Sequence, residues 1–87
     1  MEFRWNDWNV DHATAHGVSP EEAEFVVVHA RPPYPRRIDG DKWLAWGRGQ
    51  GGRLLQVIFV EREAGYYIIH ARPLTPREQR RYRRRKR

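Results

Sequence analysis

The sequence predicts one α+β domain, with an antiparallel sheet of three to four strands, two helices before the sheet and one helix after it. Three observations predict this class. Two stretches, residues 19–22 and 75–78, have the Ser/Thr-Pro-x-Glu order of a helix start. Residues 53–63 form an apolar, β-branched segment without proline. Hydrophobic residues make up 39% of the 87 residues, enough for a small core.

The N-terminal segment predicts a short strand followed by a helix. Phe3 and Trp5 alternate with polar neighbours, which suits a short first strand. Residues 7–16 favour a helix, with Trp8 facing the core, and Gly17 stands where a helix usually stops.

The second helix has the clearest start signal in the chain. Ser19 is a good N-cap, Pro20 fits the first helical position, and Glu22 completes a capping box. Three prolines within residues 32–35 then end the helix.

The middle of the chain predicts antiparallel strands joined by short turns. Asp39-Gly40 is a turn signal, and the glycine-rich residues 49–52 suit a hairpin loop. Residues 53–63 read as the central strand, and a turn at Ala64-Gly65 leads to the last one. The expected order is β-α-α-β-β-β-α, with a three-stranded hairpin sheet as the core.

The C-terminal segment, from about residue 75, predicts a basic helix that frays toward Arg87. Thr75, Pro76 and Glu78 repeat the start signal, and eight of the last eleven residues are Lys or Arg. We expect this run to bind phosphate through Arg77, Arg80, Arg81 and Arg84, or to hold an acidic protein partner.

The overall charge favours the same partners. Lys and Arg total 17 against 11 acids, a net charge of +6, and nearly all the basic residues are Arg, which binds phosphate and carboxylate bidentately. The chain has no Cys, so disulfide and thiolate chemistry are excluded. No signal peptide or membrane span is visible, so a cytoplasmic protein is expected.

Two local patterns invite a binding-site interpretation, and neither is favoured. The stretch Gly47 to Gly52 lacks the Gly-Lys-Ser/Thr ending of a phosphate loop, so a hairpin loop is preferred. His12 and His16 share one helix face, but no further ligand falls at a metal-site spacing. We therefore expect neither a metal nor another cofactor.

A dispersed set of His and Arg residues suits RNA cleavage. Strand alternation puts His70 and Arg72 on one face. Cleavage needs a base for the 2′-hydroxyl proton and cations for the developing charge on phosphate, and His suits proton transfer near neutral pH. The candidate catalytic residues are His16, Arg48, Arg62, His70 and Arg72. The alternative is that His70 is a packed strand residue and the arginines are surface charge.

Three segments in order resemble the BrnT-type toxins of bacterial toxin–antitoxin systems. "AHGVSPEEAEFVV" is similar to their Lys-His-Gly-Val-Ser-x-Glu-Glu-Ala stretch, and "WGRGQGGRLLQVIFVERE" to their Gly-Arg-x-x-x-Gly-Arg-Leu-Leu-x-Val segment. "YYIIHARPLTPREQRRY" is similar to their Ile-Ile-Ser-Ala-Arg-x-x-x-x-x-Glu-x-x-x-Tyr ending. The resemblance covers nearly the whole chain. It implies a small RelE-like domain, RNA cleavage without metal, and neutralisation by a DNA-binding antitoxin, commonly of the ribbon-helix-helix type.

The resemblance also assigns residues. It carries the family's histidine to His16 and its arginines to Arg48, Arg62 and Arg72. The chain departs from the family at Ala15, where a lysine is usual, and at residue 70, where His replaces Ser. His70 can then compensate as an acid or a base.

The predicted function is therefore the toxin of a type II toxin–antitoxin pair, acting as a metal-independent endoribonuclease. The alternative is a non-catalytic module that binds RNA or an acidic partner through its C-terminal helix. A third is a domain whose surface charge is purely structural.

Overall fold

The computed structural model describes residues 1–85 and confirms the predicted α+β class. Its four-stranded sheet is antiparallel throughout, in the order β1-β2-β3-β4. The elements are α1 (Asp7–Thr14), α2 (Pro20–Val28), β1 (Arg36–Asp39), β2 (Lys42–Arg48), β3 (Leu54–Arg62), β4 (Gly65–Pro73) and α3 (Pro76–Arg85). The two N-terminal helices, the antiparallel sheet and the C-terminal helix are thus as predicted. The expected order β-α-α-β-β-β-α is wrong, because no strand precedes α1 and β1 adds a fourth strand to the hairpin sheet. The expected fraying near Arg87 concerns residues outside those described.

The predicted helix starts are confirmed. The Ser19 side chain accepts a hydrogen bond from the backbone N–H of Glu22, whose carboxylate accepts one from the N–H of Ser19. Thr75 and Glu78 exchange the same two bonds at the start of α3. Each pair satisfies N–H groups that have no partner within the helix.

The expected first strand is wrong: Phe3 forms only one isolated parallel bridge, with Tyr66. The pairing stops because Asn6 already caps α1, in a reciprocal capping box with Asn9. The prediction that Trp8 faces the core is also wrong. The helix buries Asn9 and Ala13 instead, and Trp8 is 56% exposed.

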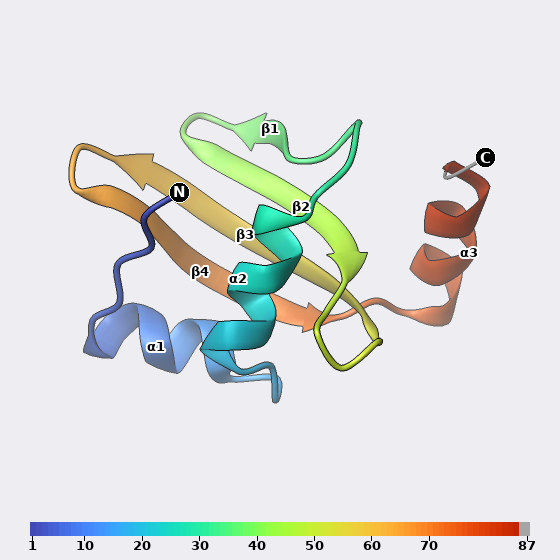
Figure 1. Cartoon of the computed structure of the whole chain (residues 1–87), viewed down its shortest axis with the longest axis horizontal. Helices are drawn as coiled ribbons and strands as arrows, with labels where there is room; N and C mark the ends of the chain where they lie inside the picture. Colours follow the sequence, from blue (N-terminus) through green and yellow to red (C-terminus); the bar gives the residue numbers. More distant parts are fainter. Residues whose placement is uncertain (86–87) are drawn as a thin grey trace.

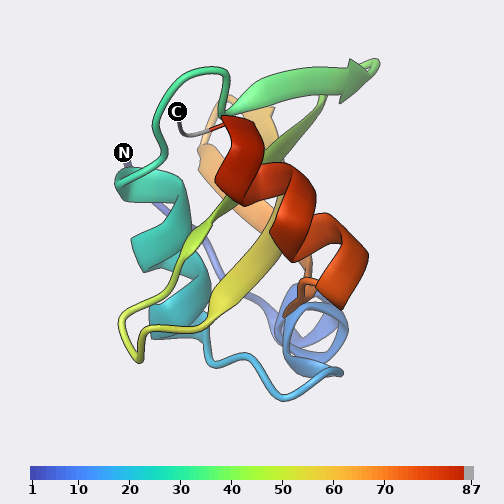
Figure 2. The same cartoon turned by 90° about the vertical axis from the view of Figure 1, so that its right-hand side faces the viewer.

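The sheet carries a separate apolar cluster on each face. One face, with Leu55, Val57 and Phe59 of β3, packs against α1 and α2. On the other face, Trp46 and Leu54 pack with Tyr34 and the partly buried Tyr82 of α3. Figure 2 shows α2 and α3 on opposite sides of the sheet.

Three side chains of helix α3 contact β4 and the segments next to the sheet. Glu78 pairs with Arg72 of β4, Gln79 donates to the carbonyl of Leu74, and the Tyr82 ring lies 6.3 Å from that of Tyr34. In Figure 1 this helix stands beyond the end of β4, apart from α1 and α2. Its arginine-rich remainder is therefore left at the surface.

Candidate functional site

The predicted pairing of His70 and Arg72 on one face of β4 is confirmed. Arg72 lies opposite Gln56 of β3, and His70 lies opposite Ile58. A register shift between Ile58 and Phe59 inserts one extra residue, Ile69, into β4. On the Gln56 side of this shift the register is regular, so both His70 and Arg72 lie within reach of Gln56.

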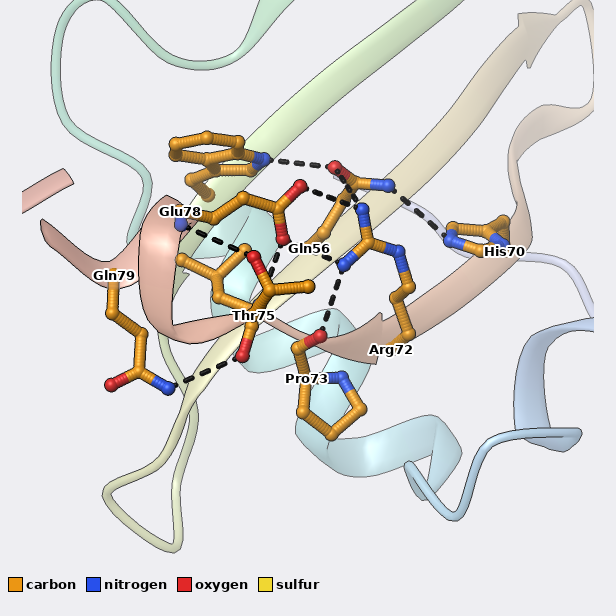
Figure 3. Close-up of polar contacts among 9 residues, drawn as sticks. Gln56, His70, Arg72, Pro73, Thr75, Glu78 and Gln79 are labelled. Carbon is orange, nitrogen blue, oxygen red and sulfur yellow. Dashed lines mark hydrogen bonds and ion pairs between the residues drawn. The ribbon is translucent and has the colours of Figure 1, made fainter. Parts of the chain in front are cut away.

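Gln56 connects the site (Figure 3). Its Oε1 accepts hydrogen bonds from Trp46 Nε1 at 3.0 Å and from Arg72 Nη2 at 3.3 Å. Both of these groups can only donate, so they fix the orientation of the Gln56 amide. Its Nε2 therefore faces His70 Nε2, 3.3 Å away, and donates to it. His70 must accept at Nε2, so it is held as the neutral imidazole with its proton on Nδ1.

The surroundings of His70 also favour the neutral form. Partial burial of the ring lowers the pKa of His70 below 6.5, and the charges of Arg72 and His16 lower it further. The ring of His16, just after α1, meets the ring of His70 edge-on, with centroids 5.8 Å apart. Two imidazoles from opposite ends of the sequence thus share one site.

Arg72 is fully engaged in this arrangement. Its Nη1 donates to Glu78 Oε1 at 2.8 Å and to the carbonyl of Pro73 at 3.1 Å. Its Nη2 donates to Glu78 Oε2 at 2.9 Å and to Gln56. The guanidinium beside Glu78 lowers the pKa of that carboxyl to about 2. Substrate can gain Arg72's Nη hydrogens only by displacing one of these acceptors.

The other two predicted catalytic arginines do not join His70. Arg48, at the end of β2, donates to the carbonyl of Gly52 and lines a separate pocket with Arg31 and Tyr82. Arg62, at the end of β3, pairs with Asp41. Arg62 lies six positions after Gln56 along the extended strand β3, which is about 20 Å.

The four arginines predicted to bind RNA all lie on α3 and are exposed: Arg77, Arg80, Arg81 and Arg84. None of them forms an ion pair with a described residue. The guanidinium of Arg81 lies over the Trp46 ring, 5.7 Å from its centroid. Trp46 also bonds to Gln56, so Arg81 is linked to the His70 site through one side chain.

The two disfavoured patterns have structural roles. The loop after β2 is tied to the start of α2 by Arg53, which pairs with Glu22 at 2.9 Å and donates to the carbonyl of Gly17. His12 stacks on Trp8, with ring centroids 3.9 Å apart. Across the described part of the chain, no three His, Asp or Glu side chains gather as a metal site would need.

Sequence reasoning missed Gln56 and the role of Glu78 in the site. Gln56 is the one polar residue within the apolar stretch 54–60, and this interruption was the available signal. The sequence indicates Glu78 only as a helix cap, because nothing local indicates its contact with β4.

Comparisons of the chain with known proteins identify no relative. No protein-family model, curated protein or solved structure matches it. No helix among residues 1–85 is long and apolar enough to cross a membrane.

Proposed function

We propose that this chain is a metal-independent endoribonuclease of the RelE-like type, acting in the cytoplasm as the toxin of a type II toxin–antitoxin pair. One observation carries the proposal: His16 and His70 lie in edge contact beside Arg72, with the exposed arginines of α3 nearby. Paired imidazoles next to phosphate-binding cations are what RNA cleavage needs.

The two histidines divide the proton transfers. Neutral His70 takes the proton of a 2′-hydroxyl, and the 2′-oxygen attacks the adjacent phosphorus. The bond from phosphorus to the 5′-oxygen breaks, and His16 gives that oxygen a proton. The products are a 2′,3′-cyclic phosphate and a free 5′-hydroxyl. Gln56 holds His70 Nε2 at 3.3 Å, a long hydrogen bond that a substrate hydroxyl can replace.

Arg72 stabilises the charge that develops on the phosphate. In the resting arrangement Glu78 occupies it, so an RNA phosphate must compete with this carboxylate. The α3 arginines raise the local concentration of RNA and so assist that exchange. The same basic surface suits an acidic segment of a DNA-binding antitoxin, such as a ribbon-helix-helix protein.

The test is cleavage of a mixed-sequence RNA by the purified chain in the presence of a chelator. His70→Ala and His16→Ala should each lower the rate by roughly 10²–10⁴-fold, the usual contribution of an acid or base. His29→Ala is the matched control, because His29 is exposed and lies at the end of α2. The products should carry cyclic phosphate ends.

The cellular test is growth. Inducing the chain alone in bacteria should arrest growth, and co-expressing its antitoxin should restore it. Normal growth with intact RNA, while soluble protein is present, would reject the toxin proposal. Equal cleavage by wild type and His70→Ala would reject the assigned base.

A second candidate is a non-catalytic module that binds RNA. The contacts that engage Arg72 and His70 favour it, because Glu78 and Gln56 satisfy these groups without any substrate. Retained RNA binding with no cleavage by the wild-type chain would select this alternative.

A further inference from the structure

A pocket of about 490 Å³ lies beside the proposed site and has no role in the chemistry described above. It is lined by residues from α1 and its cap, by the end of the β2–β3 pairing where Lys42 lies opposite Val60, and by β4. The lining residues that matter here are Asn6, Trp8, Lys42, Arg62, Tyr67 and Ile69. Its volume falls within the usual range of small-molecule sites.

Trp8 is the most unusual residue of this pocket. It is the one tryptophan of the chain that is exposed, at 56%, and it stacks on His12. An exposed indole beside a pocket offers a flat apolar surface to a ligand, and Tyr67 adds a second ring. Exposed aromatic side chains of this kind are the usual stacking platforms for bases of single-stranded RNA.

The pocket lies on the same face of the sheet as His70. Tyr67 is opposite Val60, and the extra residue Ile69 directly precedes His70 on β4. On the helix side, Trp8, His12 and His16 follow one another at four-residue spacing along one face of α1 and its end. At 1.5 Å per residue, Trp8 and His16 lie about 12 Å apart. A short RNA strand can therefore reach from the pocket to the histidines.

The charges of the pocket suit a nucleotide. The side chain of Lys42 forms no ion pair or hydrogen bond with the residues that the structure describes. Arg62 pairs with Asp41, but both side chains are about half exposed, at 53% and 52%. Exposed pairs are weak, so a phosphate can draw Arg62 away. The backbone N–H of Asn6 donates to Asn9 Oδ1 and Asn6 Oδ1 accepts from the N–H of Asn9, so the side-chain Nδ2 of Asn6 is the group that can donate to a base.

We propose that this pocket binds a base of the RNA substrate, a short distance along the strand from the scissile phosphate. The base stacks on Trp8 and Tyr67, and Lys42 and Arg62 hold its phosphate. This inference rests on the proposed ribonuclease function and adds a site that sets where the RNA lies. It also gives Arg62 a binding role, although its place in the fold keeps it from His70.

The experiment follows the indole N–H signals of the full chain by NMR while a nucleoside 5′-monophosphate is added. The Trp8 signal, identified as the one lost in Trp8→Phe, should shift in a saturable way. Trp8→Ala should weaken nucleotide binding about 5- to 150-fold, the range for loss of one stacked base. Ribose 5-phosphate, which has the phosphate but no base, should bind much more weakly than the nucleotide.

The matched control is Phe25→Ala. Phe25 stacks on His29 on α2 as Trp8 stacks on His12 on α1, but it lines a different pocket. Phe25→Ala should leave nucleotide binding unchanged. Equal losses in the two variants, no Trp8 shift, or equal affinity for ribose 5-phosphate would each overturn the proposal.

A cleavage assay separates this inference from the proposed function. Trp8→Ala should raise KM for a short RNA more than it lowers kcat, whereas His70→Ala should keep nucleotide binding and lose turnover. If nucleotide binds at Trp8 but the wild-type chain cleaves no RNA, the ribonuclease proposal is rejected and the nucleotide-binding pocket is retained. If Trp8→Ala cleaves RNA with an unchanged KM, the proposal of a base-binding pocket is rejected and the ribonuclease proposal is retained.

Discussion

At the scale of single residues, the protonation of His70 is set by its neighbours. Gln56 cannot turn its amide, because Trp46 and Arg72 both donate to its oxygen. It therefore donates to His70 Nε2, and only the neutral imidazole accepts there. Partial burial and the charge of Arg72 act in the same direction. A base that stays neutral near pH 7 is what the proposed reaction requires.

This geometry predicts the titration of His70. Its pKa, measured from imidazole NMR shifts, should lie below 6.5, and Arg72→Ala should move it upward by removing a nearby positive charge. The unfolded chain binds a proton at His70 more readily than the folded chain. Above pH 6.5 neither state binds this proton, so the free energy of unfolding is not reduced there. It should fall as pH drops below 6.5 toward the folded pKa. A His70 pKa above 6.5 would contradict the deduced hydrogen bonding.

At the scale of elements, one carboxylate both starts α3 and attaches it to the sheet. Glu78 caps the helix by accepting from the N–H of Thr75 and binds Arg72 through both of its oxygens. The cap was predictable, because Thr75 and Glu78 are three residues apart in the sequence. The contact of Glu78 with Arg72 could not be predicted from the sequence, since it depends on where β4 ends and on how α3 turns back over Trp46.

Glu78→Gln should loosen α3 without unfolding the sheet. We expect a loss of on the order of 1 kcal/mol at pH 7, allowing for solvent around the pair, with faster amide exchange in α3. The Glu78 pKa of about 2 stabilises the fold above pH 4.5, and this contribution is lost as pH falls from 4.5 toward 2. Urea unfolding at several pH values should therefore show a weaker acid dependence in Glu78→Gln.

The control for this change is Glu21→Gln, which removes an exposed carboxylate from the first turn of α2. It should leave α3 exchange unchanged. If Glu78→Gln has no effect on exchange in α3, the pair with Arg72 does not hold the helix.

At the scale of the whole molecule, positive charge is unevenly distributed over the surface. The net charge of +6 is concentrated on α3, whose inner face packs on the sheet through Tyr82 and whose outer face carries exposed arginines. The glycine-rich loop and α2 are instead joined by the ion pair of Arg53 and Glu22. The arginine-rich helix is thus the surface on which a polyanion is expected to bind.

RNA binding should accordingly depend on salt through α3. Replacing Arg80 and Arg84 by Gln should reduce the slope of log affinity against log salt by about 1.4, since each phosphate contact on a single strand contributes about 0.7. The charge-matched control replaces Arg31 and Arg36, which are exposed and lie outside α3. Equal slope changes in both variants would show that net charge alone matters. If the α3 variant loses antitoxin binding while the salt dependence of its RNA affinity is unchanged, α3 binds the antitoxin and not RNA.

The sequence by itself determined the features whose causes lie within a few residues of one another. The capping boxes at Ser19 and Thr75, the Asp39-Gly40 turn and the apolar run of β3 were predicted, because each signal acts on the local backbone. The His70–Arg72 pairing on β4 was predicted for the same reason, since alternation along a strand is a local property.

Only the tertiary structure decided which distant side chains meet. The strand register brings Gln56 to Arg72, and α1 ends where His16 reaches His70. The same register keeps Arg62 at the far end of β3, although the sequence grouped it with the histidines. Trp8 looked like a core residue, yet α1 buries Asn9, which donates to the carbonyls of Arg4 and Ile68. Such choices depend on contacts between elements, because a helix of mixed composition can turn either face inward until its neighbours are in place.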